Sequence, residues 1–353
     1  MTRIERLAEL LEEPLLVAGP PYVLGGQANV RYLTGLQSSN AALLVEPDAT
    51  ATLYTDFRYA ARGREVEGVT FVEAPRYLLA FVGEQLAGRR ILFEEAHLPY
   101  AGYRALADAG VDAVPTSGLV ESLRAVKDDE EIAIMRRAGA LSDVIFQALS
   151  EERFSGRTER ELVWWVERSF RDAGADGVSF PTVVAAGETA TSPHADPGDR
   201  AIEEGVLVVV DAGCVLDGYC SDCTRTFAVG DISDRLREIY ALCLEAQLAG
   251  LAAVAPGAHG RDADAAARDV IDAAGLGDAF GHGLGHGVGI QIHEGPVLRP
   301  ESTDVLESGH VVSVEPGIYL PGEGGVRIED LVLVTEDGSE RLTRFTKDLL
   351  TVA

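Results

Sequence analysis

Four acidic residues in two similar segments carry the strongest chemical signal in the sequence. Residues 208–213 and 312–317 each consist of an apolar run, an acid, and a glycine two residues after the acid. Each segment is followed by a turn and by a second strand-like run with another acid, four residues after a glycine. The four acids are Asp211, Asp222, Glu315 and Glu329. Separations of 11 and 14 residues suit two strands joined by a short loop, so the acids of each pair could lie across from one another.

Acids in a strand that should be buried are costly unless a cation compensates their charge. Arg225 and Arg327 are the basic residues close by in the sequence, and two guanidinium groups are too few for four carboxylates. A pair of divalent metal ions would compensate all four. The alternative is that each acid points to solvent from a half-exposed strand. Because the positions are duplicated, we favour a metal centre.

A glycine-rich run at residues 281–293 contains three of the seven histidines, His282, His286 and His293. Its glycine spacing matches neither the dinucleotide-binding GxGxxG motif nor a P-loop, and it lacks the glutamate of HExxH. One histidine nitrogen in an oxygen-rich site suits Mn²⁺, Co²⁺ or Fe²⁺, with Zn²⁺ as a further alternative. The other two histidines would then be available for substrate or for proton transfer, and His194 in a turn is a fourth candidate.

The remaining histidines and the cysteines receive structural interpretations. His97, His259 and His310 belong to no glycine-rich or acidic motif that we recognise, so we interpret them as structural. Cys220 and Cys223 form one CxxC pair, but no second pair or suitably spaced histidines follow to complete a zinc site. We therefore expect the four cysteines to be buried thiols.

Composition excludes some classes of partner. The chain has 57 Asp plus Glu against 30 Lys plus Arg, a formal net charge of −27, which argues against nucleic acid because phosphate binding requires clustered Lys and Arg. Apolar residues make up 46% of the chain, enough for a large core. No apolar stretch approaches the roughly 18 residues of a membrane span, and the start does not resemble a signal peptide. We expect a cytoplasmic protein with no membrane partner.

The elements that must position these residues fall into two domains. Up to about residue 122, strand-like runs such as 41–45 and 52–54 alternate with helical runs such as 77–86, which predicts an α/β domain. We therefore predict domains at 1–122 and 123–353.

Helices should alternate with β segments in the second domain. Acids at 128–131 open a long helix, and Thr158 with Glu161 forms a capping box for the next one, whose two tryptophans we interpret as core. Two further helices are predicted at about 234–250 and 262–274.

The order and spacing of the acids and His286 resemble the five metal ligands of the M24 "pita-bread" metallopeptidases, in particular the M24B group of Xaa-Pro dipeptidases (prolidases) and Xaa-Pro aminopeptidases. The HxxxHxxGxxxH run formed by His282, His286, Gly289 and His293 strengthens the resemblance. Residues 29–35 and 55–59 resemble the creatinase-type first domain of these enzymes. The resemblance implies a creatinase-like N-terminal α/β domain followed by a pita-bread catalytic domain with a pseudo-twofold internal duplication.

Roles for individual residues follow from the resemblance. It implies that Asp222 and Glu329 bridge two metal ions, Asp211 completes one, and His286 with Glu315 completes the other. Manganese is favoured, with cobalt, zinc or iron as alternatives. Glu315 would also shuttle a proton. The other carried-over positions are the substrate and transition-state histidines His194, His282 and His293, and the supporting Arg327 and Tyr319.

The implied activity is hydrolysis of Xaa-Pro peptide bonds in small peptides, by a protein that the resemblance implies is a homodimer. Our first interpretation is an Xaa-Pro dipeptidase, and an Xaa-Pro aminopeptidase acting on longer peptides remains open. A dipeptidase must recognise the carboxylate after proline, for which Arg31 and Arg58 are candidates. A pita-bread binding module without catalysis is a third interpretation, disfavoured because all five ligands are present.

Overall fold

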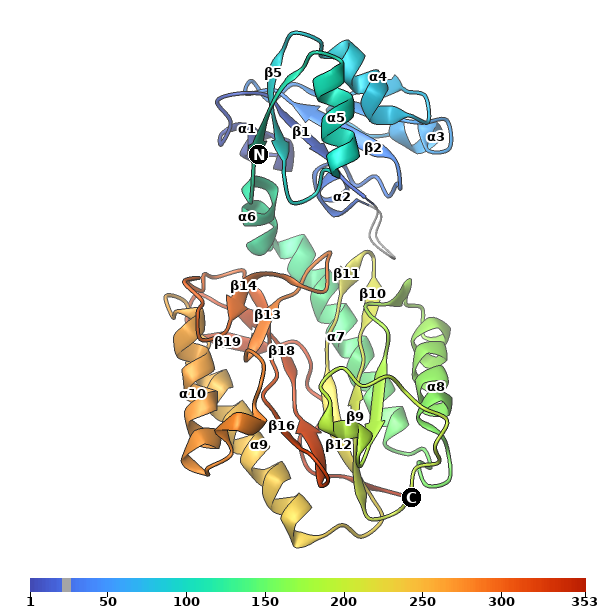
Figure 1. Cartoon of the computed structure of the whole chain (residues 1–353), viewed down its shortest axis with the longest axis vertical. Helices are drawn as coiled ribbons and strands as arrows, with labels where there is room; N and C mark the ends of the chain where they lie inside the picture. Colours follow the sequence, from blue (N-terminus) through green and yellow to red (C-terminus); the bar gives the residue numbers. More distant parts are fainter. Residues whose placement is uncertain (21–26) are drawn as a thin grey trace. The chain divides into compact units, whose positions relative to one another are not determined.

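The computed structural model describes residues 1–20 and 27–353, which form two compact units, Met1–Arg124 and Ala125–Ala353 (Figure 1). The division predicted after residue 122 falls inside helix α6 (Leu119–Ala125), two residues before the observed boundary. Within the described residues, no helix combines the length and the apolar character needed to cross a bilayer.

The first unit is built on a six-stranded sheet with the order β4-β3-β2-β1-β5-β6. Strand β1 pairs in parallel with β5 and antiparallel with β2, and β5 pairs in parallel with β6. The strands are β1 (Leu15–Ala18), β2 (Ala41–Val45), β3 (Ala51–Thr55), β4 (Thr70–Glu73), β5 (Arg90–Glu94) and β6 (Asp112–Thr116). The helices preceding α6 are α1 (Arg3–Ala8), α2 (Ala28–Thr34), α3 (Ala60–Gly63), α4 (Leu78–Gln85) and α5 (Tyr100–Asp108). The predicted strands at 41–45 and 52–54 and the helix at 77–86 are confirmed as β2, β3 and α4.

The second unit repeats one order of elements twice, as the internal duplication predicts. Each half contains two long helices, two short strands and then four strands. The first half comprises α7 (Asp129–Leu149), α8 (Glu159–Asp172), β7 (Gly177–Val178), β8 (Val183–Ala186), β9 (Val206–Asp211), β10 (Cys214–Leu216), β11 (Tyr219–Cys220) and β12 (Thr224–Val229). The second half comprises α9 (Asp234–Ala253), α10 (Gly260–Ala273), β13 (Gly285–Gly287), β14 (Glu294–Leu298), β15 (Val311–Val314), β16 (Gly317–Leu320), β17 (Gly324–Arg327) and β18 (Asp330–Val334). The chain ends with β19 (Ser339–Arg341) and β20 (Thr351–Val352).

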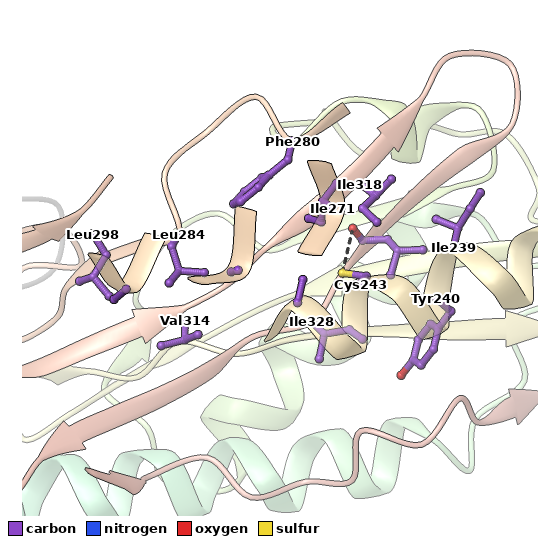
Figure 2. Packing of buried hydrophobic residues seen from close by; sticks show 14 of the residues in the cluster. Ile239, Tyr240, Cys243, Ile271, Phe280, Leu284, Leu298, Val314, Ile318 and Ile328 are labelled. Atoms are coloured by element: carbon purple, nitrogen blue, oxygen red, sulfur yellow. Dashed lines mark hydrogen bonds between the residues drawn. The ribbon is translucent and has the colours of Figure 1, made fainter. Parts of the chain in front are cut away.

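The strands of the second unit form two larger sheets and two small ones. The larger sheets have the orders β20-β12-β9-β8 and β14-β13-β15-β18-β19, and the small ones are β11-β10-β7 and β16-β17. Strands β15 and β18 are buried along their whole length, and all of their residues are apolar except Ser313 and Asp330. Helices α9 and α10 pack with this half of the unit around Ile239, Ile271, Val314 and Ile328 (Figure 2).

Capping residues explain where the long helices begin. Asp128 and Thr158 form the N-terminal capping boxes of α7 and α8, with Glu131 and Glu161 returning the second hydrogen bond. The prediction that both tryptophans of α8 are core is wrong for Trp164, which is 68% exposed on the outer face of the helix. The expectation of buried thiols is confirmed for all four cysteines.

A buried ion pair holds the C-terminal segment to the two halves of the second unit. Arg225 on β12 donates to Asp330 Oδ1 on β18 at 2.7 Å, and both side chains are almost inaccessible to solvent. Arg225 also donates to the carbonyl oxygens of Phe345 and Thr346, and Lys347 Nζ lies 2.8 Å from Asp330 Oδ2. Every charged group in this network therefore has a partner, which a buried charge requires.

Replacing Arg225 by Met should lower the free energy of unfolding by about 3–5 kcal/mol, because Asp330 would lose its closest cation while remaining buried. Arg168→Met is the matched control, since Arg168 and Asp172 form an ion pair in which both side chains are 68% exposed and such pairs contribute little. The measurement is urea denaturation followed by circular dichroism. Equal midpoints for the two variants would contradict this account of the network.

Candidate metal centre and active site

The four acids lie at equivalent junctions of the two halves. Asp211 ends β9 and Asp222 lies between β11 and β12; Glu315 follows β15 and Glu329 precedes β18. In each half the chain continues beyond the acids into a second hairpin, β10-β11 or β16-β17. Each pair of carboxylates thus lies where one strand ladder ends and the next begins.

The register shows how the acids of each pair face one another. Val314 pairs with Asp330, so Glu315 and Glu329 occupy the next opposed positions of the second half. In the first half Asp211 pairs with Thr224 instead, and the ladder continues with a hydrogen bond from Ala212 N to Cys223 O. The prediction that both acid pairs could lie directly across their hairpins therefore fails for Asp211 and Asp222.

Hydrogen bonds between the halves bring the two pairs together. Glu329 N donates to Thr224 O at 3.1 Å, and Thr224 Oγ1 donates to Glu329 Oε2 at 2.8 Å. Oxygen atoms of Asp211, Asp222 and Glu329 all lie within 4.8 Å of one another. The Nε2 atom of His286 lies 3.3 Å from Glu315 Oε1 and 3.7 Å from Asp222 Oδ2. All five residues predicted as metal ligands consequently meet in one cluster.

Burial excludes the alternative that Asp222 and Glu329 point to solvent. Asp222 is 4% exposed and Glu329 only 1%. Burial, followed by the negative charges of Asp211 and Glu315, raises the pKa of Asp222 well above its usual value. Burial and the charge of Asp222 do the same to the pKa of Glu329. The protein alone therefore leaves these groups short of positive charge.

His286 and Glu315 show the opposite behaviour because they contact each other. Burial would lower the pKa of His286, but the hydrogen bond and charge of Glu315 outweigh it and raise the pKa to about 9. Burial would raise the pKa of Glu315, yet its contact with His286 lowers the pKa to about 2. Without metal ions, the protonated imidazole of His286 thus balances part of the negative charge of the cluster.

Two buried oxygens provide a direct test of whether the cluster fits metal ions. Asp211 Oδ1 and Glu329 Oε1 are buried and have no hydrogen-bond partner among residues 1–20 and 27–353. Buried polar atoms are normally satisfied, so each marks a position where a ligand is expected. Four carboxylates with one imidazole form a donor set that suits divalent cations such as Mn²⁺, Co²⁺ or Fe²⁺. The residues present fit a pair of such ions.

Neighbouring side chains orient the ligands. His286 Nδ1 lies 3.0 Å from Gly287 O, which leaves Nε2 directed at the acids. Ser313 Oγ accepts from His286 N and donates to Glu315 Oε1, both at 3.0 Å. Ser313 and Thr224 were not predicted from the sequence, because an isolated Ser or Thr in an apolar strand gives no signal of this role.

Arg327, Tyr319 and His282 form a chain of hydrogen bonds that starts at Asp211. Arg327 Nη2 donates to Asp211 Oδ2 at 2.6 Å and Nη1 to Tyr319 Oη at 2.9 Å. Tyr319 Oη lies 3.0 Å from His282 Nε2, and His282 Nδ1 lies 2.8 Å from Gly283 O. Both ring nitrogens of His282 therefore have partners within the protein.

The cluster forms one wall of a cleft of about 480 Å³. Asp211, Asp222 and Glu315 line it together with His194, His282 and His293, and the ring centroids of His286 and His293 lie 4.3 Å apart. Burial, then the charge of His286, lowers the pKa of His293, which favours its neutral form. His194 and His293 are exposed to the cleft, so their rings can meet a substrate.

The two arginines predicted as candidates for recognising a substrate carboxylate, Arg31 and Arg58, lie in the first unit, whereas a third arginine lines the cleft. Arg31 lies on α2, and Arg58 is bound by Asp56 through contacts of 2.9 and 2.7 Å, both within the first unit. Arg299 lines the cleft and was missed, because it follows the histidine run without any motif of its own. No hydrogen bond or ion pair engages the Arg299 guanidinium group within the described part of the chain.

Comparison with known proteins identifies the class. Residues 133–336 match metallopeptidase family M24, and residues 3–126 match the creatinase/prolidase N-terminal domain. The chain belongs to metallopeptidase family M24, and the creatinase-type and pita-bread architecture predicted from the sequence is confirmed.

Individual relatives cover nearly the whole chain. An Xaa-Pro dipeptidase of Pyrococcus furiosus is 34% identical over 99% of each chain. The structure of an Xaa-Pro dipeptidase from Bacillus anthracis is similar with a TM-score of 0.93 and 38% identity over 99% of each chain. An X-Pro aminopeptidase from Thermotoga maritima is similar with a TM-score of 0.89 and 31% identity over 98% of this chain and 100% of that one. The chain is thus a metallopeptidase with relatives in both activity groups.

Replacing Asp222 by Asn should abolish the stabilisation that divalent cations give the protein. In the wild type, an ion bound only by the folded state stabilises that state, and the gain grows with the logarithm of the ion concentration divided by the dissociation constant. Asp222 lies among the other acids of the cluster. The measurement is thermal denaturation of chelator-treated protein with and without added Mn²⁺. Asp231→Asn, at a side chain that is 97% exposed, is the control and should respond like the wild type. An unchanged response of Asp222→Asn would remove the assignment.

Proposed function

We propose that this metallopeptidase hydrolyses Xaa-Pro peptide bonds with two bound divalent metal ions and acts as an Xaa-Pro dipeptidase. The observation that supports this proposal most strongly is the convergence of four carboxylates and His286 in one cluster beside a histidine-lined cleft. Asp211, Asp222, His286, Glu315 and Glu329 would hold the ions. When bound, such a pair of ions lowers the pKa of water and stabilises negative charge on the scissile carbonyl.

The side chains around the cluster would carry the remaining tasks. A bond to proline is a tertiary amide, whose nitrogen must be protonated before it can leave. Glu315 would take a proton from the attacking water and pass it to that nitrogen. His194 and His293 face the cleft, and a ring N–H of each can be donated to the carbonyl oxygen of the substrate.

His282, Tyr319 and Arg327 would position the site rather than touch the reacting atoms. Arg327 fixes one oxygen of Asp211 and balances part of the negative charge, and Tyr319 links it to His282. This assignment differs from the direct substrate role that the family resemblance suggests for His282, since both ring nitrogens are occupied by Tyr319 and Gly283.

Arg299 supports the choice of dipeptidase. A dipeptidase must recognise the free carboxylate that follows proline, and a guanidinium group suits that task. Arg299 supplies such a group in the cleft of the catalytic unit itself, which Arg31 and Arg58 of the first unit do not. The similarity to the Thermotoga maritima X-Pro aminopeptidase keeps a second candidate, cleavage of longer peptides with proline in second position.

Three further features remain predictions. They are manganese as the native metal, assembly as a homodimer, and a cytoplasmic location.

Replacing Arg299 by Ala should lower kcat/KM for Leu-Pro about tenfold, as expected for a lost hydrogen bond to a charged group of about 1.5 kcal/mol. Hydrolysis of Leu-Pro-Gly should change little, because its proline carries no free carboxylate. The assay measures release of leucine from both peptides, with Arg261→Ala on α10 as the control. Faster cleavage of the tripeptide by the wild type, with no effect of Arg299→Ala on Leu-Pro, would favour the aminopeptidase.

Replacing His293 by Ala should lower kcat about 10²- to 10³-fold, the usual loss when a donor to a developing oxyanion is removed. The bound metal should be retained, because His293 is not among the five ligands. Turnover of Leu-Pro and metal content by mass spectrometry are measured on the same preparation. If metal is lost in parallel with activity, then His293 is a metal ligand and its assignment as a substrate-binding histidine is wrong.

A further inference from the structure

A second cluster of ligating side chains lies in the first unit, at the carboxyl end of strand β5. Glu94 is the last residue of β5, His97 lies in the turn that follows, and Glu121 lies in the first turn of α6. One ligand atom from each lies within 4.8 Å of the other two. Strand β5 runs parallel to β1 and β6, and the carboxyl ends of parallel strands are common binding positions.

Glu94 itself indicates that a ligand is expected there. The residue is 2% exposed, and its Oε1 atom accepts from Asn29 Nδ2 at 2.6 Å. Its Oε2 atom is buried and has no hydrogen-bond partner among the residues that the structure describes. Leaving such an atom unsatisfied is costly whether the carboxyl group is ionised or protonated.

Hydrogen bonds from Asn29 hold the carboxylates of Glu94 and Glu121 close together. Asn29 Nδ2 also donates to Glu121 Oε1 at 2.6 Å, and Arg124 Nη1 donates to Asn29 Oδ1 at 2.6 Å, which fixes the orientation of the amide. His97 Nε2 contacts Glu121 Oε1 at hydrogen-bond distance. Such supporting hydrogen bonds are typical around metal ligands.

The cavity beside Glu94 and His97 has the size of one small ligand. Glu94, His97, Asn29 and Val17 line a cavity of about 10 Å³, which is about the volume that one water molecule or one ion requires. The side chain of Glu121 is 34% exposed, so the cluster is open to solvent on that side.

We propose that Glu94, His97 and Glu121 bind one divalent transition-metal ion, with Zn²⁺ as the best fit. Two carboxylate oxygens and one imidazole nitrogen are ligands that Zn²⁺ accepts, with water completing the coordination, whereas Mg²⁺ prefers oxygen ligands alone. The ion joins β5, the turn after it and α6 within the first unit. The surroundings of His97 therefore differ from the sequence-based interpretation, which found no acidic context for this histidine. This proposal stands independently of the proposed peptidase activity.

The competing account is that protons, not a metal ion, balance the charge. Burial and then the charge of Glu121 raise the pKa of Glu94 to about 8, so Glu94 without an ion would hold a proton at neutral pH. In that account Glu94→Gln is a neutral exchange with no effect on metal content, which makes the two accounts distinguishable.

The test is zinc stoichiometry of the full chain. Wild type, Glu94→Gln and Glu95→Gln are freed of metal with a chelator and dialysed against Zn²⁺, and bound zinc is measured by mass spectrometry. We expect Glu94→Gln to bind one ion fewer per chain than the wild type. Glu95→Gln changes the adjacent, exposed glutamate and should bind as many ions as the wild type. Equal counts in wild type and Glu94→Gln would overturn the proposal.

A second measurement needs no substitution. Anomalous scattering at the zinc edge, from crystals of the zinc-loaded wild type, should give a peak within coordination distance of Glu94 Oε2 and His97 Nε2. Absence of that peak would overturn the proposal even if Glu94→Gln failed to fold. His97→Ala should lose the same single ion.

Discussion

The mutual repulsion of carboxylates buried inside the second unit is the constraint on which the rest of the structure depends. Asp222 and Glu329 are almost inaccessible to solvent and lie beside two further acids, in surroundings that screen charge poorly. A protein does not retain such a group of acids unless cations balance it. Of the four acids, Arg327 donates a hydrogen bond only to Asp211, and Arg225 is occupied by Asp330 and main-chain carbonyls. The four acids therefore carry more negative charge than these arginines balance, and metal ions can balance the rest.

The duplicated fold explains how the four acids are brought together. The two halves place their acids at equivalent positions. Each half brings two acids to the junction between two consecutive strand ladders, and the hydrogen bonds of Thr224 join the halves at that junction. The same β12 segment carries Arg225, whose network with Asp330 fixes the strand that follows Glu329. The residues of the ion-pair network thus lie next to those of the site in the sequence, Arg225 beside Thr224 and Asp330 beside Glu329. A change in the network is therefore expected to disturb the site.

The sequence predicted the cluster well because its chemistry is local and repeated. Acids at matching places in two apolar segments, and histidines among glycines, are visible without knowledge of the fold. The register of Asp211 opposite Thr224 was not predictable, because strand pairing depends on where the turns place the ladder. Other residues were missed for a related reason. Arg299 and Ser313 belong to no recognised motif, and Glu121, which contacts His97, comes from a distant part of the sequence. Trp164 was assigned to the core by residue type, although its position on α8 faces solvent.

The most direct measurement of the central claim is an anomalous difference map at the manganese edge, from crystals of the Mn²⁺-loaded protein. The account predicts two peaks surrounded by the carboxylates of Asp211, Asp222, Glu315 and Glu329, with Nε2 of His286 coordinating one of them. A map with no peak among these carboxylates, from protein that hydrolyses Leu-Pro in the same solution, would contradict it.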